Sequence, residues 1–180
     1  MLYALNTMLL VSCALCALCD FFTYKIPNKI LMFIAALFLL RAIAILPGHE
    51  ITNHIIIGVA ALGVGFILYA FKFIGAGDAK FIAVCMLWID QSNTLIFILS
   101  TAVFGGMLAL LYATLNKPIT AVRECGLSRM SAMPWGAALL RDKLSTPQLG
   151  DNRVSEGIIP YGVAVFSGVL CTSILNKGIF

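Results

Sequence analysis

Phe73–Lys80, with the sequence FIGAGDAK, separates two strongly apolar segments of this chain, residues 54–71 and 79–91. Asp78 follows two closely spaced glycines and stands at the mouth of the second segment. A carboxylate in such a place is costly to remove from water, so it is a candidate functional residue. Asp20, at the end of the first apolar run, is the only comparable acidic residue. The two aspartates are the most informative feature of the sequence.

The composition indicates an integral membrane protein. The 180 residues are 61% hydrophobic and 11% charged, with a mean hydropathy of +1.01. That leaves too little polar surface to cover a soluble core. The apolar runs approach the roughly 20 residues that a helix needs to cross a bilayer, which argues against the short alternating strands of a membrane barrel. We therefore predict an all-α polytopic membrane protein with one membrane-embedded domain over residues 1–180.

Six apolar segments predict about six transmembrane helices, and the breaks between them carry turn or charge signals. The segments are 2–19, 30–46, 54–71, 79–91, 94–115 and 157–175. No basic residue precedes the first segment and no small-residue cleavage pattern follows it, so we expect a retained span and not a cleaved signal peptide.

The basic residues predict the orientation of these spans. Ten of the twelve lie in the connections between spans one and two, three and four, and five and six. Basic loops stay cytoplasmic, so we expect both termini to be external and residues 116–156 to form a cytoplasmic or interfacial segment. Asp20 ends an inward span and Asp78 begins an outward one, so both carboxylates should lie at the cytoplasmic face.

The fourth span is too short for the bilayer. Ala79–Ile89 contains 11 residues, which cover roughly 16 Å of a core about 30 Å thick. Either the bilayer thins at this point or the helix begins below the membrane surface. We favour the second interpretation, which places Asp78 in a recess that water reaches only through a cavity.

Two facing carboxylates a few ångströms apart cannot both ionise cheaply, so they share a proton. The ionised group can take a proton from water as the water attacks a peptide carbonyl, and the protonated group can polarise that carbonyl. This is the chemistry of aspartic proteases, and it requires no metal or cofactor.

Other catalytic sets are weak in this sequence. His49 and His54 fall in the expected short external loop, where we interpret them as ordinary residues, and no H-E-x-x-H or G-x-S-x-G pattern occurs. Cys13, Cys16 and Cys19 lie inside an apolar helix, so we interpret them as small residues that pack one helix face.

The sequence around the two aspartates resembles a known family. Residues 75–80, GAGDAK, look like the G-x-G-D-x-K motif of type IV prepilin peptidases, which are bacterial inner-membrane aspartic proteases. Residues 20–28, DFFTYKIPN, are similar to the other signature of that family, an Asp followed by a basic residue and Ile-Pro-Asn, with Lys25 where Arg is usual. Residues 157–164, GIIPYGVA, resemble the opening of the final span in compact members that serve tight-adherence (Flp-type) pili.

The resemblance implies that Asp20 and Asp78 are the catalytic pair. It implies prepilin or pseudopilin substrates, cut on the cytoplasmic side after a Gly that precedes a hydrophobic helix. Larger members also methylate the new N-terminus and carry an extra cytoplasmic domain after the first span. Residues 20–29 leave no room for such a domain, so we expect peptidase activity alone. We expect no cofactor, no metal and no nucleic-acid partner beside the substrate and the bilayer.

Six further residues are expected to support the site: Gly75, Gly77, Lys80, Lys25, Pro27 and Asn28. The glycines allow close backbone approach or a positive φ, or merely break the helix. The turn at Pro27 and Asn28 would orient Asp20 by ending one helix and starting the next. The lysines would balance the charge of the carboxylates or contact an acidic substrate residue, unless they only set the topology and bind anionic lipid.

Two other function classes stay open. Paired membrane carboxylates also carry protons or cations, so the chain could be a small transporter. A conduction path needs polar residues beyond the midplane of the bilayer. We expect the outer half of the spans to be apolar instead, with Arg41 extending outward to water. A non-catalytic assembly factor is the third class.

The stretch Met133–Lys143 looks like a short interfacial helix. We expect this helix to cover the carboxylates, to contact the substrate or to serve as a plain linker.

Overall fold

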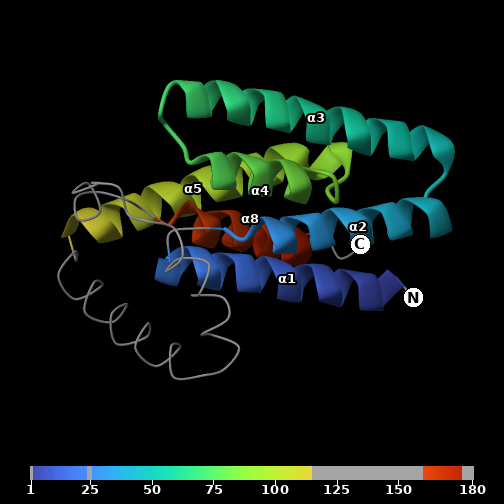
Figure 1. Ribbon diagram of the computed structural model, residues 1–180, viewed down its shortest axis with the longest axis horizontal. Helices are drawn as coiled ribbons and strands as arrows, with labels where there is room; N and C mark the ends of the chain where they lie inside the picture. The colour runs from blue at the N-terminus through green and yellow to red at the C-terminus, as the bar shows by residue number, and fades with distance from the viewer. Residues whose placement is uncertain (1, 24–25, 115–159, 176–180) are drawn as a thin grey trace. The chain divides into compact units, whose positions relative to one another are not determined.

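The computed structural model describes residues 2–23, 26–114 and 160–175, and these residues are almost entirely helical (Figure 1). No strand occurs in these three ranges. The helices are α1 (Leu2–Thr23), α2 (Asn28–Ala44), α3 (Gly48–Ala70), α4 (Ala76–Met86), α5 (Thr94–Thr114) and α8 (Tyr161–Leu175). The predicted all-α class is confirmed. Lys25 and the segment 116–156, including the helix expected at Met133–Lys143, lie outside the described residues.

Among the described residues, three stretches are long and apolar enough to cross a membrane: Tyr3–Phe22, Gly48–Ala70 and Gln91–Thr114. Helix α8 is apolar but shorter. Several spans in one chain confirm a polytopic membrane protein, while the count of six and the external termini stay predictions. Helix α3 begins at Gly48 and not near residue 54, because Pro47 ends the connection in an extended conformation (φ −68°, ψ 150°).

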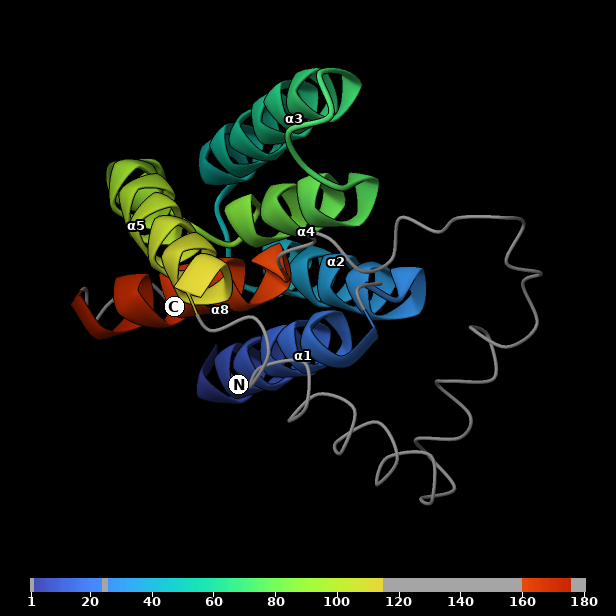
Figure 2. The ribbon, with the colours of Figure 1, turned by 90° about the vertical axis from the view of Figure 1, so that its left-hand side faces the viewer.

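The chain divides into two compact units by its contacts, Met1–Met107 with Pro160–Phe180 and Leu108–Ile159. In the first unit α4 is the central helix. Helices α2, α3 and α8 all pack against it, and α8 also packs along α1 (Figure 2). Five of the 11 residues of α4 are buried, Phe81 and Cys85 almost completely. An 11-residue helix that is enclosed by protein does not have to match the bilayer thickness, which explains why the fourth apolar segment is short.

Two glycines bring α3 close to α4. A Cβ on Gly65 would lie 3.0 Å from the Cβ of Ala79, and one on Gly58 would meet the side chain of Leu87. Because Gly58 faces the end of α4 and Gly65 faces its beginning, the two helices run antiparallel. Small residues at helix contacts are typical of membrane proteins, where association depends on close packing. The opposite side of α3 exposes large apolar side chains, among them Val59 and Phe66, as expected of a surface that faces lipid.

The turn from α3 to α4 contains an unusual backbone conformation. Lys72 has φ 62°, which falls in the left-handed region that L side chains rarely adopt. The Lys72 N–H bonds the Tyr69 carbonyl at 2.9 Å, and the Phe73 N–H bonds the Leu68 carbonyl at 3.0 Å. This is the Schellman pattern that closes a helix C-terminus. It ends α3 sharply and leads the chain into the first turn of α4, which carries Asp78.

Candidate active site

Asp20 lies in the last turns of α1, on the face that packs into the bundle, and only 5% of it is exposed. Its Oδ2 accepts a hydrogen bond of 2.7 Å from the backbone N–H of Gly162. Gly162 is the second residue of α8, where backbone N–H groups have no partner within the helix. The positive end of the helix dipole also favours a negative charge at this point. The start of α8 therefore both satisfies and orients the Asp20 carboxylate.

The absence of a side chain at Gly162 makes this contact possible. A Cβ at that position would lie 2.9 Å from both the Cβ and the Oδ2 of Asp20. The sequence stretch 157–164 pointed to the opening of the last span, but it did not identify Gly162 as a residue of the site. A backbone donor leaves no side-chain signal beyond the glycine that permits its approach.

Asp78 is the third residue of α4, and its carboxylate turns back toward the start of the helix. Gly75 precedes the helix in an extended conformation (φ −73°, ψ 149°), and its backbone N–H interacts with the Asp78 carboxylate. An acidic side chain at this helical position commonly bonds the N-cap amide. A Cβ on Gly75 would lie 2.9 Å from Oδ2 of Asp78. The φ of Gly75 is negative and suits any residue, so the backbone conformation does not require glycine. The glycine instead allows the Asp78 carboxylate to come close to the backbone.

The segment between α1 and α2 meets the start of α4. A Cβ on Gly77 would lie 3.6 Å from the Cβ of Ile26, so the Ile-Pro-Asn stretch after Asp20 packs against the glycine before Asp78. Pro27 caps α2 in an extended conformation, and its carbonyl accepts the N–H of Ile30 at 3.1 Å. The proline thus stands just before the first turn of α2. Asn28 is exposed.

One buried contact between α1 and α4 sets the register of the two helices that carry the aspartates. Cys13 of α1 and Cys85 of α4 are both buried, and their sulfur atoms lie 3.9 Å apart. Asp20 follows Cys13 by seven residues and Asp78 precedes Cys85 by seven, which is about two helical turns and returns to nearly the same face. The negative charge of Asp78 acts on the Asp20 carboxylate. Lys80, in contrast, is exposed.

The cysteines of α1 lie where the sequence predicted. Cys13, Cys16 and Cys19 are buried on the packed face of the helix. Across the described ranges no cluster of three or more His, Cys, Asp or Glu residues could hold a metal ion.

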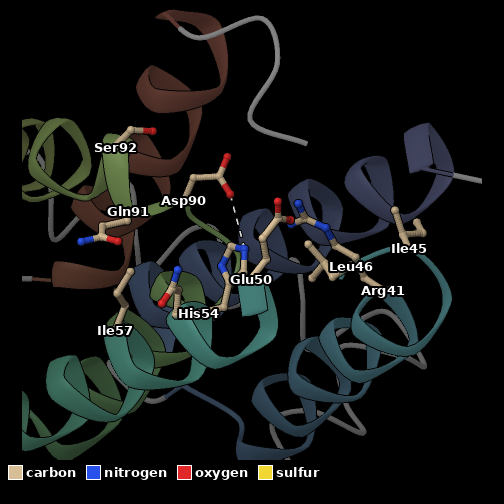
Figure 3. Close-up of a pocket in the computed structure, with 10 residues that line it drawn as sticks. Arg41, Ile45, Leu46, Glu50, His54, Ile57, Asp90, Gln91 and Ser92 are labelled. Atoms are coloured by element: carbon tan, nitrogen blue, oxygen red, sulfur yellow. Dashed lines mark ion pairs between the residues drawn. The ribbon is translucent and has the colours of Figure 1, made fainter. Parts of the chain in front are cut away.

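The opposite end of the bundle is polar, which contradicts the prediction of an apolar outer half. A cavity of about 490 Å³ opens there, between the end of α2, the start of α3 and the turn after α4 (Figure 3). Arg41 does not extend outward, since only 5% of it is exposed and its Nη1 donates to the Trp88 carbonyl at 3.2 Å. His49 and His54 lie within α3 and not in a loop, and His54 is buried.

The apolar helices define a polytopic helical membrane protein, and one end of its bundle carries the buried Asp20 and the half-buried Asp78. The model of the type IV leader peptidase family matches residues 7–110, more than half of the chain. The protein therefore belongs to the type IV leader peptidase family, and the matched range includes both Asp20 and Asp78. No curated protein matches the chain, and no solved structure matches it either.

Proposed function

We propose that this protein is an aspartic endopeptidase that removes the leader peptides of prepilins or pseudopilins, with Asp20 and Asp78 as its catalytic pair. Family membership supports a leader peptidase in general. The observation that carries the two-aspartate mechanism is the register of α1 and α4: each carboxylate lies two turns from the Cys13 to Cys85 contact, Asp20 after Cys13 and Asp78 before Cys85. Cleavage is proposed to occur at the cytoplasmic face of a bacterial inner membrane.

The proposed reaction is a hydrolysis in which the carboxylates exchange protons with water and substrate. The ionised carboxylate takes a proton from water while the water oxygen bonds the peptide carbonyl carbon. The protonated carboxyl donates to the carbonyl oxygen, which becomes a hydroxyl as the tetrahedral intermediate forms. The C–N bond then breaks, the hydroxyl returns its proton, and the nitrogen of the mature chain takes the proton first removed from water. No cofactor takes part in these steps.

The surroundings of Asp20 and Asp78 support this chemistry. Each carboxylate is oriented by a backbone amide, from Gly162 and Gly75 respectively. Groups held in place by the fold need little reorganisation during the reaction, and such pre-organisation is a large part of enzymatic rate enhancement. We propose peptidase activity without methylation of the new N-terminus, because α2 begins at Asn28 and the chain leaves no space for a domain between α1 and α2.

Leader removal from a co-expressed prepilin tests the proposal. The parent chain should shorten the prepilin on a gel, whereas Asp20→Asn and Asp78→Asn should each reduce cleavage at least about a hundredfold, in line with the loss of acid–base catalysis. Asp151→Asn, which removes a charge from the predicted cytoplasmic segment, is the matched control and should cleave normally. Normal processing by either single variant would refute the pair, and no processing by the parent chain would refute the peptidase.

A transporter is the second candidate function, and the polar cavity at the other end of the bundle is the observation that favours it. Between Asp78 and Asp90, however, the buried side chains include Phe81 and Cys85 of α4 and Trp88 of the turn that follows it, each 1% exposed or less. The part of α4 that joins the two polar ends is therefore packed and apolar, which favours a peptidase over a conduction path. Proton or cation flux in proteoliposomes that depends on Asp20 would reverse this preference.

A further inference from the structure

The cavity opposite the two aspartates contains a buried cation whose bonding is incomplete. The guanidinium of Arg41 lies 5.4 Å from the centre of the Trp88 ring, and its Nη1 donates to the Trp88 carbonyl. Its Nε has no hydrogen-bond partner. In the described ranges the ion pairs are His49–Glu50 and His54–Asp90. No described carboxylate oxygen therefore lies within 4.0 Å of a nitrogen of the Arg41 guanidinium. A buried charge with an unmet donor is expensive.

A second buried polar group, His54, lines the same cavity. His54 is 4% exposed, and its Nε2 lies 3.4 Å from Oδ1 of Asp90. Its ring also interacts with the backbone of Ile89, but Nδ1 has no hydrogen-bond partner of good geometry. Native proteins pair nearly all buried polar atoms, and an exception calls for an explanation such as a bound molecule. Two such side chains in the lining of one cavity of about 490 Å³ make the cavity a candidate binding site.

The charges of the cavity are arranged in depth. Arg41 is buried, whereas the side chains of Glu50 and Asp90 are 49% and 42% exposed. Figure 3 shows these three side chains turned toward one another from α2, α3 and the turn after α4. An oxyanion would find the guanidinium deep in the cavity, and a cation would find the two carboxylates nearer the opening. The arrangement suits a single molecule that carries both charges.

The cavity lies where helices end. Arg41 belongs to the last turn of α2, Glu50 to the first turn of α3, and Asp90 follows α4. Helix ends of a polytopic membrane protein lie near the boundary of the bilayer, among lipid headgroups. We propose that this cavity is a binding site for a zwitterion with a phosphate and an ammonium group, the chemistry of a phosphoethanolamine headgroup. The phosphate binds Arg41, and the ammonium group binds Glu50 and Asp90.

Native mass spectrometry of the full chain in detergent tests the site. We expect one equivalent of phosphatidylethanolamine to bind saturably, roughly tenfold or more tighter than phosphatidylglycerol, which has the phosphate but no ammonium group. Soluble phosphoethanolamine is titrated in parallel. If it binds and the lipids do not, the zwitterion site stands and its ligand is a free molecule. Equal affinity for the two lipids in the parent chain would overturn the proposal.

Variants separate the two halves of the site. Arg41→Gln should weaken binding of both lipids roughly tenfold or more, while Lys29→Gln, which removes a cation from the opposite end of α2, should leave binding unchanged. If Arg41→Gln does not fold, the double variant Glu50→Gln with Asp90→Asn decides the question, because both side chains are partly exposed. This double variant should lose the preference for phosphatidylethanolamine. A retained preference, or unchanged binding by folded Arg41→Gln, would refute the site.

Discussion

Backbone amides, more than charged side chains, orient the two acidic residues of this protein. Asp20 receives the N–H of Gly162 at 2.7 Å, and Asp78 interacts with the N–H of Gly75. Both donors stand at the beginning of a helix, where unpaired amides and the helix dipole favour an anion. At each position a side chain on the glycine would crowd the carboxylate. We therefore expect both glycines to affect the proposed catalysis without taking part in its chemical steps.

Gly162→Ala should slow leader cleavage strongly. The new Cβ would lie 2.9 Å from Oδ2 of Asp20, so the carboxylate has to move away from its amide donor. A displacement of about 1 Å in a reacting group costs roughly a hundredfold in rate, and we expect the loss in kcat with little change in KM. Gly106→Ala is the control, because a Cβ there meets nothing within 4 Å. Parental kcat in Gly162→Ala would refute the positioning role.

The two glycines before Asp78 should respond differently to alanine. A Cβ on Gly75 would lie 2.9 Å from the Asp78 carboxylate, whereas one on Gly77 would make an ordinary contact of 3.6 Å with Ile26. We expect Gly75→Ala to lower kcat roughly tenfold or more by turning Asp78 away, and Gly77→Ala to stay within about threefold of the parent. The two purified variants are compared on the same prepilin. The reverse order of damage would contradict the geometry.

The sequence pointed to Asp20 and Asp78 as candidate site residues, because a carboxylate in an apolar segment can be recognised without knowledge of the fold. It missed Gly162, since a backbone donor acts through its place in space. The prediction for Arg41 was wrong, because the residue that Arg41 bonds, Trp88, lies 47 residues away. When α2 is considered by itself, water is the only partner available to the Arg41 side chain. His54 was misplaced for a related reason. Its helix begins six residues before it at Gly48, and its partner Asp90 belongs to another element.

At the level of elements, the meeting of α1 and α4 explains how two distant motifs approach one another. Cys13 and Cys85 touch in the middle of the bundle, and Ile26 packs on Gly77 nearer the aspartates. The first contact holds the helix segments before Asp20 and after Asp78, and the second holds the segments that follow Asp20 and precede Asp78. The seven-residue spacing on each helix was readable in the sequence, but the pairing of the two helices was not.

Oxidation of a chain that keeps only Cys13 and Cys85 tests this register. With the other four cysteines changed to alanine, iodine should couple the two sulfur atoms, which need only approach from 3.9 Å to the roughly 2.05 Å of a disulfide. Loss of both thiols to alkylation, followed by mass spectrometry, measures the reaction. A chain that keeps Cys19 and Cys85 is the control and should stay reduced. Failure of the first pair, or equal coupling of both, would contradict the register.

Gly65 of α3 should be sensitive to substitution by a larger residue. Gly65→Val places a branched side chain where a Cβ already comes within 3.0 Å of Ala79, next to Asp78. Overpacking of this kind costs about 1–3 kcal/mol, so the melting temperature in detergent should fall. Gly63→Val is the matched control on the same helix, because its Cβ would meet nothing within 4 Å. Equal melting temperatures of the two variants would show that α3 and α4 are not in close contact.

At the scale of the whole molecule, the order of the apolar segments predicted the order of the helices well. The helix lengths were less predictable. Helix α4 is enclosed by α2, α3 and α8, so its length of 11 residues depends on the packing of these helices more than on the thickness of the lipid bilayer. The polarity of the two ends was only half predicted. One end carries the aspartates, and the other carries the cavity around Arg41, whose members are spread over three elements.

The central claim is that Asp20 and Asp78, 58 residues apart in the chain, act as one catalytic unit. The most direct measurement is kcat for leader cleavage by purified parent, Asp20→Asn, Asp78→Asn and the double variant. Residues that act as a unit show strongly non-additive losses. We predict that each single variant loses at least about a hundredfold and that the double variant is no slower than the slower single variant. Losses that multiply in the double variant, or parental kcat in either single variant, would contradict the account.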